Sequence, residues 1–449
     1  MVEKYKLYSG LLFGSIWVIL CQGFIATEIP VFEKLVPIIN LLTDAVFILL
    51  GIWVTRSKRD IFVTVSFFAV VLVSKYINHQ SLFVMVNGCR YYIGLLMCAP
   101  VIRYLLRSKY AEDFTRRMDS LCWKFLYLQA FCITWQFLRY GANDYGGGSF
   151  GLGGSGQVST LIYIVSFYLL SKRWDFSKKW LENFKENKAN FILLYPTFLN
   201  ETKISFIFLM IYFMLLYPID RKYILRALAV FPLVLVIMFG AFYVYLSATE
   251  QEGDSVLNKE FLDIYLFGGE DPQELIDLAI VYQEEQYSED NLWMVDLPRF
   301  TKIFAAYDVL EDMRGALSFG VGVGQFKGGT YVSESKFASK YGWLMDGTKP
   351  TMLIVLLDLG LAGVVWIIVN LATVLFTRNR SPFAIQLRLY LFAIWSLIMV
   401  YDQQLTVLIS VWFMFYIAMS GLQPELKEQR QKTRHRGLMR LEASEGNAY

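Results

Sequence analysis

Residues 351–376 read TMLIVLLDLGLAGVVWIIVNLATVLF, an apolar run interrupted by a single charged residue, Asp358. A helix needs about 20 such residues to cross the hydrocarbon core of a bilayer. Similar runs recur along the chain. The first, Leu11 to Ile25, lacks a small-residue cleavage site, so we expect it to be a membrane helix and not a signal peptide. The pattern predicts an all-α polytopic membrane protein.

The composition agrees with lipid as the main solvent. Of 449 residues, 56% are hydrophobic and only 18% are charged, whereas soluble domains carry roughly 25% charged residues. The net charge of +3 says little, because in a membrane protein the position of a charge matters more than the sum. Five cysteines without a CxxC pair and only two histidines indicate neither a disulfide framework nor a metal site. We therefore expect no cofactor, no metal and no nucleic-acid partner.

The apolar runs predict about twelve transmembrane helices. They lie near residues 9–27, 35–54, 60–77, 89–107, 119–139, 157–172, 188–199, 202–218, 226–247, 351–376, 385–401 and 404–420. With this count, the basic clusters at 56–59, 103–117, 172–188, 221–226, 378–388 and 427–440 all fall on one side. The positive-inside rule makes that side cytoplasmic. The chain is thus expected in the bacterial inner membrane with both termini in the cytoplasm.

Four regions follow from this topology. Residues 1–247 hold the first nine spans, including a glycine-rich outer loop at 140–156, and residues 248–350 form a large periplasmic loop. Residues 351–420 hold the last three spans, and residues 421–449 form a basic cytoplasmic tail. The run at 188–199 is short and contains Pro196, so we expect it to go out and return as a hairpin with its polar tip at residues 200–203.

The large loop carries an unusual predicted helix. It begins after Asp296-Leu-Pro298 and ends near Gly315. At 100° per residue, three cations share one arc with apolar residues, while acids lie on the opposite side. The cations are Arg299, Lys302 and Arg314, their apolar neighbours are Ile303, Ala306, Leu310 and Met313, and the acids are Asp308, Glu311 and Asp312. Inward-facing cations indicate an anionic partner; the alternative is that they reach lipid head groups.

Two segments are rich in glycine, one at residues 140–156 and one at residues 320–329 that includes Gly322 and Gly324. Glycine-rich turns let backbone N–H groups approach a phosphate or a sugar closely. The alternative is that both are flexible turns. The second lacks the GxxxxGK[ST] pattern and lies on the predicted outer side, so we exclude a nucleotide-binding loop.

Four short stretches of the chain stand out together. In order, they are Asp144-Tyr-Gly-Gly-Gly-Ser-Phe-Gly151, Asn200-Glu-Thr-Lys203-Ile-Ser-Phe, Arg299 with Ser318-Phe-Gly-Val-Gly-Val-Gly-Gln-Phe326, and Asp358-Leu-Gly-Leu-Ala-Gly363. Each is similar to a motif of the O-antigen polymerase/ligase superfamily, which comprises Wzy-type polysaccharide polymerases and O-antigen ligases, and the resemblance covers about residues 85 to 376.

The resemblance implies a metal-independent membrane glycosyltransferase of GT-C-like fold that joins oligosaccharide repeat units at the periplasmic face. Donor and acceptor would be glycans linked to undecaprenyl diphosphate, with the lipid diphosphate as leaving group and a chain-length regulator as a possible partner. Arg299 and Lys203 would bind the diphosphate by motif, and Arg139 and Arg90 are candidates by position. Preplaced cations stabilise the charge that develops on a departing diphosphate.

The general base stays open among Asp144, Glu201 and His79. Ligases of the superfamily carry a histidine where this chain has Lys349, which favours a polymerase. An O-antigen ligase or a related membrane glycosyltransferase is the first alternative function. A polysaccharide transporter is the second, although transporters usually show internal repeats with matched polar residues at mid-membrane.

Overall fold

The computed structural model describes residues 2–55, 57–92, 94–108, 110–141, 146–200, 204–216, 299–326, 335–345, 349–375 and 382–401. These ranges are mainly helical and contain no β-strand, only one isolated bridge between Gly146 and Leu152. The all-α prediction is therefore confirmed for this part of the chain.

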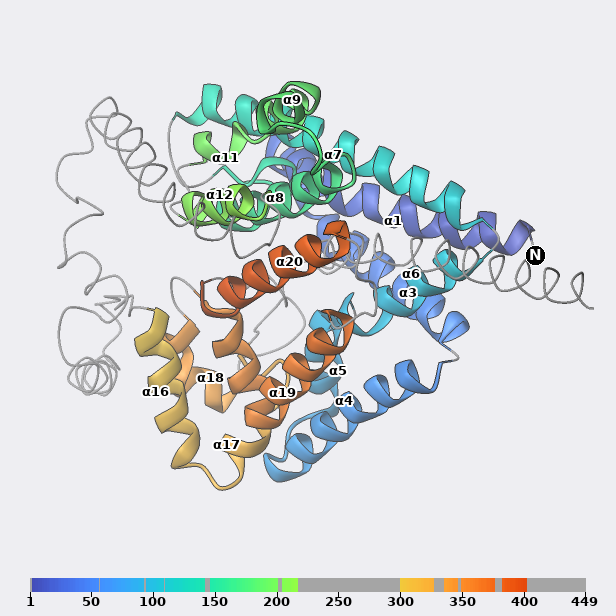
Figure 1. Ribbon diagram of the computed structural model, residues 1–449. Coiled ribbons are helices and arrows are strands. Elements are labelled where there is room, and N and C mark those ends of the chain that lie inside the picture. The colour runs from blue at the N-terminus through green and yellow to red at the C-terminus, as the bar shows by residue number, and fades with distance from the viewer. Residues whose placement is uncertain are drawn as a thin grey trace, which may run out of the picture.

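Long helices form the body of the protein and short ones connect them (Figure 1). The long helices are α1 (Val2–Glu28), α3 (Val36–Val54), α4 (Lys58–Ile77), α7 (Ala111–Tyr140), α8 (Ser155–Ser171), α12 (Ile204–Met214), α16 (Arg299–Glu311), α19 (Thr351–Leu375) and α20 (Pro382–Tyr401). The short α-helices are α2 (Pro30–Glu33), α5 (Leu82–Cys89), α6 (Ala99–Arg107), α9 (Trp180–Glu186), α10 (Lys188–Ile192), α11 (Pro196–Leu199), α17 (Ala316–Phe319) and α18 (Lys336–Tyr341). Three 3₁₀ turns, η1 (Arg90–Tyr92), η3 (Gly148–Phe150) and η4 (Gly342–Met345), and one π-helix, η2 (Gly94–Cys98), complete the described elements.

Helices α1 and α7 run side by side in the same direction (Figure 1). Near their N-termini, Tyr5 donates a hydrogen bond to Asp113 over 3.0 Å. At their C-termini, Arg139 forms an ion pair with Glu28. We call the end of the bundle with Tyr5 and Asp113 the basic end, and the end with Glu28 and Arg139 the glycine end.

Helix α3 runs antiparallel to α1, from the glycine end to the basic end. Helix α4 then starts at the basic end and runs away from it. Tyr8 of α1 lies with its ring centroid 6.0 Å from Trp53 and 5.8 Å from Tyr104, so the ends of α3 and α6 meet at the basic end. There Asp60, at the start of α4, forms an ion pair with Arg103 of α6. The chain thus crosses between the two ends several times before α7.

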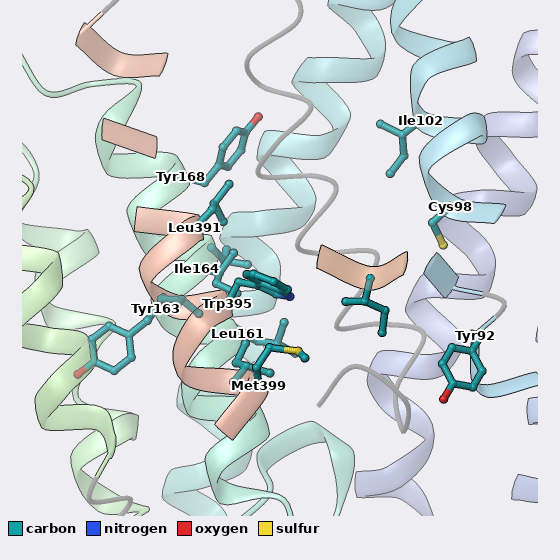
Figure 2. Packing of buried hydrophobic residues seen from close by; sticks show 14 of the residues in the cluster. Tyr92, Cys98, Ile102, Leu161, Tyr163, Ile164, Tyr168, Leu391, Trp395 and Met399 are labelled. Carbon is teal, nitrogen blue, oxygen red and sulfur yellow. The ribbon is translucent and has the colours of Figure 1, made fainter. Parts of the chain in front are cut away.

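Helix α8 is the centre of the bundle, because every side chain from Gln157 to Ser171 is buried. It runs antiparallel to α7, since Tyr168 and Lys172 both bond Asp119 near the start of α7. Helix α20 packs antiparallel to α8 in turn. Figure 2 shows Leu391 beside Tyr168 and Met399 beside Leu161, and the ring of Tyr390 stacks on Phe167 with centroids 3.9 Å apart. Tyr401, the last residue of α20, therefore lies at the glycine end.

The predicted span at 188–199 consists of two short helices, α10 and α11, and not of one continuous helix. Pro196 has no N–H to donate to a carbonyl one turn earlier, so the chain turns before it and α11 starts afresh. Asn190 donates to the Ser166 carbonyl, and Thr197 donates to the Tyr163 hydroxyl. This segment therefore runs along α8, antiparallel to it, toward the glycine end. Helix α12 returns beside α8, as the contact between Phe208 and Tyr163 shows.

The predicted span at 89–107 begins earlier, at Leu82, and is broken in the middle. Its halves, Leu82–Tyr92 and Leu96–Leu106, are bent by 59° around η1 and η2. Each half is attached to a neighbouring helix by a buried carboxylate. Arg90 pairs with Asp44 of α3, and Arg103 pairs with Asp60 of α4. Breaking a buried pair by removing one partner is costly, so these contacts fix the bent segment.

Helix α19 crosses antiparallel to α4, because Trp366 in its second half donates to Ser66 near the start of α4 over 3.0 Å. The helix is interrupted at Gly360, whose backbone has φ 62° and ψ −162°. This conformation is open to glycine and strained for other residues. The span predicted from residues 351–376 is thus present, with a break that the apolar pattern alone does not reveal.

Four described helices are long and apolar enough to cross a membrane, or five if the bent pair counts as one span. They are Lys4–Glu28, Val36–Val54, Asp60–Ile77 and Thr351–Asn370, with Ser155–Ser171 and Ile385–Tyr401 as shorter apolar helices. The directions of the described helices alternate as the predicted topology requires. The count of twelve stays a prediction, because the expected spans at 226–247 and 404–420 and the tail at 421–449 lie outside the described residues.

Replacing Gly23 with alanine is expected to lower the melting temperature of the purified protein. A Cβ at Gly23 would overlap the backbone carbonyl of Phe150 in η3, and overpacking costs about 1–3 kcal/mol. Gly14→Ala is the matched control on the same helix, because a Cβ there meets nothing within 4 Å. Equal melting temperatures for the two variants would contradict this packing of η3 on α1.

Candidate functional site

The first glycine-rich segment is held at the glycine end by two side-chain amides of α7. Gln136 donates to the carbonyls of Gly148 and Gly151, over 2.9 and 3.0 Å, and accepts from the Gly148 N–H over 2.8 Å. Gln129 accepts from the Ser149 N–H over 2.9 Å. Both amides are buried, so the glycine turn has a defined shape in which helix side chains replace water as hydrogen-bond partners.

The polar tip predicted at residues 200–203 begins beside this segment. Asn200 is 1% exposed, and a Cβ added to Gly146 would lie only 2.7 Å from its Oδ1. Two sequence motifs far apart in the chain, the glycine loop and the start of the polar tip, therefore meet. The candidate residues Asp144, Glu201 and Lys203 lie outside the described residues.

Arg139 lies at the same place but is engaged within the protein. Its guanidinium pairs with Glu28, and its side chain is 49% exposed. Glu28 also accepts from the indole N–H of Trp135 over 3.1 Å. The ion pair with Glu28 thus fixes the position of the Arg139 guanidinium at the glycine end.

The second glycine-rich segment, residues 320–324, is docked between the end of α4 and the break in α19. The Gly320 carbonyl accepts from Ser74 over 3.2 Å and from Asn78 over 2.9 Å. The Val323 carbonyl accepts from Gln80 over 2.6 Å. Gly320, Gly322 and Gly324 all have positive φ, at 70°, 111° and 84°. A side chain at Gly322 would meet the Gln80 amide, so this loop fits closely against the turn that follows α4.

The same loop contacts the Asp358-Leu-Gly360 break directly. Val321 N–H donates to the Leu357 carbonyl over 2.8 Å, and Gly324 N–H donates to the Asp358 Oδ1 over 3.2 Å. A Cβ at Gly320 or at Gly360 would overlap the backbone of the other segment. The third and fourth motif stretches thus form one interface.

Arg90 lies in η1, next to this interface. Its Nε donates to Asp44 over 2.7 Å and its Nη2 pairs with the same carboxylate over 2.7 Å. The Arg90 side chain is 33% exposed and that of Asp44 only 8%. Two residues on, Tyr92 donates its hydroxyl proton to Asp358 over 2.9 Å. Arg90 is therefore held within the body of the protein and partly open to solvent.

Arg299 begins α16 and contacts the end of α20. Its Nε donates to the Tyr401 carbonyl over 2.8 Å, and its guanidinium carbon lies 4.2 Å from the Tyr401 ring centroid. Lys302 is 0% exposed, which confirms that its side of the helix faces inward. Burial raises the pKa of Asp308 on the other side, and the Asp312 carboxylate adds to that rise.

Arg314 does not share the inward arc with Arg299 and Lys302, and that part of the prediction is wrong. Helix α16 ends at Glu311, so the 100° spacing does not extend to residue 314. Gly315 follows in the left-handed conformation with φ 78° and starts α17. Arg314 is consequently exposed on the turn between α16 and α17.

The described candidates lie in separate contacts, Arg139 and Arg299 at the glycine end and Arg90 at the break of the bent span. Arg139 belongs to the α1–α7 pair, Arg90 to η1, and Arg299 to the α16–α20 contact. His79 is exposed, with φ 50°, in the turn between α4 and α5. Within the described ranges, no group of three or more His, Cys, Asp or Glu side chains could hold a metal ion.

Several positioning residues are not evident from the sequence. Gln80, Gln129 and Gln136 look like polar residues inside or beside apolar runs, and Tyr92 like one aromatic residue among many. Glu28 gives the clearest signal, because an acid at the end of an apolar run must find a partner or water. The arginine that pairs with it is 111 residues away, which no local pattern indicates.

No family model matches this sequence, and no curated protein matches it at a significant level. The functional assignment therefore depends on the residues of this chain.

Replacing Gln136 with leucine is expected to loosen residues 146–154. The change removes the side-chain partner of the Gly148 N–H and of the Gly151 carbonyl, and one of the two donors to the Gly148 carbonyl, and each unsatisfied buried group costs about 1–3 kcal/mol. The measurement is the rate at which a nonspecific protease cuts this segment in the purified protein. We expect at least a roughly tenfold increase.

The control is Thr134→Val on the same helix, whose hydroxyl bonds Ala130 and Tyr195 and not the glycine loop. A cleavage rate for Gln136→Leu no higher than that of the control would show that the amide does not hold the segment.

Proposed function

We propose that this chain is a membrane glycosyltransferase that joins lipid-linked oligosaccharide repeat units, with a polyprenyl diphosphate as the leaving group. The observation that carries the proposal is the docking of residues 320–324 on the break at Asp358–Gly360. These are two of the four stretches that resemble the O-antigen polymerase/ligase superfamily, and they are expected to meet if both belong to one site. Two of the candidate arginines, Arg139 and Arg299, lie together at the glycine end of the bundle.

The distribution of charged residues supports the assignment of the glycine end to the periplasmic side. The connections at 103–117 and 172–188 are rich in lysine and arginine and lie at the basic end, where Asp60 and Asp119 bind Arg103 and Lys172. The positive-inside rule makes the basic end cytoplasmic. The glycine end then faces the periplasm, where lipid-linked repeat units would be polymerised.

The chemistry follows from placing cations around a leaving diphosphate. Glycosyl transfer breaks the bond between the anomeric carbon and the diphosphate oxygen, so negative charge grows on that oxygen. A guanidinium offers two parallel N–H donors to phosphate oxygens. Arg299 is suited to this role because Tyr401 already orients it, and Lys302 adds a buried amino group one turn along α16.

The acceptor hydroxyl needs a base within hydrogen-bond reach. Asp144, Glu201 and His79 remain the proposed candidates. Asp144 and Glu201 are close in sequence to Gly146 and Asn200, and His79 is exposed in the turn between α4 and α5. Lys349 stands where ligases of the superfamily carry a histidine, which favours polymerisation over transfer to another lipid.

Arg299→Ala is expected to reduce chain extension at least about a hundredfold, the usual loss when one donor to a developing oxyanion is removed. Arg299→Lys should recover only part of the rate, since the two-donor geometry is lost. Glycan length would be measured in cells whose only copy of the protein is the variant, with protein amount checked in the same membranes.

The matched control is Arg173→Ala. Arg173 also lies over an aromatic ring, 5.1 Å from the Trp123 centroid, but at the basic end. Its removal should leave glycan length unchanged. Normal extension by well-expressed Arg299→Ala would contradict the diphosphate role, and loss of attachment with normal chain length would indicate a ligase.

A further inference from the structure

Asp358 is a carboxylate buried inside a predicted membrane span. It is 3% exposed and lies two residues before the break at Gly360 in α19. A charged group at such a depth is expensive unless it is paired or hydrogen-bonded. Both of its oxygens accept hydrogen bonds from other segments, Oδ1 from the Gly324 N–H over 3.2 Å and Oδ2 from the Tyr92 hydroxyl over 2.9 Å.

The two donors come from the two segments that matter most for the proposed site. Gly324 ends the docked glycine loop, and Tyr92 ends η1, which begins with Arg90. The loop also packs directly on α5, because a Cβ at Gly88 would overlap the Val323 backbone. The loop, α5 and α19 therefore meet with backbone against backbone around one carboxylate.

Tyr92 connects Asp358 to Arg90, whose guanidinium is a candidate for anion binding. Both residues belong to the single turn η1, so fixing the Tyr92 ring fixes the backbone from which Arg90 extends. At its other end, Arg90 is held by Asp44 of α3 over 2.7 Å. Asp358 and Asp44 thus restrain the same turn, one through Tyr92 and the other through Arg90.

We infer that Asp358 is a positioning residue that locks the 320–324 loop to η1 and so sets the place of Arg90. It does this by accepting from Gly324 and Tyr92 at once, and it does not itself touch a substrate. The locking of the loop is independent of the proposed function, and only the last step, in which Arg90 binds a lipid diphosphate, rests on it.

The two hydrogen bonds to Asp358 can be removed separately or together by substitution. Asp358→Leu removes both acceptors and leaves the Gly324 N–H without this partner in an apolar setting. Asp358→Asn keeps the shape, can still accept from Gly324, and can donate to the Tyr92 oxygen, because a phenol is also an acceptor. Tyr92→Phe removes only the hydroxyl. Tyr163→Phe is the matched control. Tyr163 is also fully buried, but its hydroxyl accepts a hydrogen bond of 3.2 Å from Thr197 and does not contact the loop.

The first readout is amide hydrogen exchange of residues 318–326 in the purified, folded protein. We expect Asp358→Leu to speed exchange at least about tenfold, because a buried donor has lost its acceptor. Asp358→Asn should stay within about threefold of wild type, Tyr92→Phe should fall between the two, and Tyr163→Phe should equal wild type. If Asp358→Leu does not fold, the exchange rates of residues 318–326 in Tyr92→Phe and Tyr163→Phe are compared instead to test the lock. Equal exchange in those two variants, or in Asp358→Leu and wild type, overturns the lock.

The second readout is the affinity of the full-length protein for a polyprenyl diphosphate in lipid nanodiscs. Asp358→Leu and Arg90→Ala should both weaken binding at least about tenfold, the expected loss for one charge-assisted bond, while Asp358→Asn retains it. Wild-type affinity in Asp358→Leu, with exchange accelerated, overturns the link to Arg90. Absence of binding in the wild type, with exchange accelerated in Asp358→Leu, refutes the proposed function and leaves the lock standing.

Discussion

The contact on which the rest of the structure depends is the approach of two backbones, residues 320–324 and the break at Gly360. Neither Gly320 nor Gly360 could carry a side chain there, because a Cβ on either would overlap the other segment. Inside a membrane every exposed N–H and carbonyl must find a partner within the protein. The break in α19 is tolerated because the glycine loop supplies such partners, as in the bond from Val321 to the Leu357 carbonyl.

The two glycine segments obey the same rule with different side chains. Residues 148–151 are held by the amides of Gln129 and Gln136, and residues 320–324 by Gln80, Asn78 and Asp358. In each case a polar side chain forms hydrogen bonds with backbone N–H or C=O groups of the loop, which would otherwise need water as a partner. Gln129, Gln136 and Asp358, which lie inside predicted spans, are therefore explained by the loops they hold.

Much of the helical framework could be predicted, because continuous apolar runs and one-sided basic clusters are physical consequences of the bilayer. The runs at 35–54 and 60–77 match α3 and α4 closely, and the inward position of Lys302 follows from helix periodicity. The failures have local causes. Arg314 lies beyond the end of α16, and the 89–107 and 188–199 segments contain breaks that apolarity does not encode.

The partners at the candidate site could not be predicted, because they join distant parts of the chain. Asp44 and Arg90 are 46 residues apart, and Tyr92 and Asp358 are 266 apart. Read from sequence alone, Arg90 is only a cation at a helix end. In the structure its guanidinium is held by Asp44 and its side chain is 33% exposed, a combination suited to binding an anion.

The most direct test of the functional account uses the purified protein in vesicles with a synthetic repeat unit on polyprenyl diphosphate, in the presence of EDTA. Released polyprenyl diphosphate and new glycosidic bonds would be counted in the same reaction. The account predicts chains of several repeat units and one released polyprenyl diphosphate for each bond formed. A folded protein that releases none, or that extends chains only when a divalent ion is restored, would contradict it.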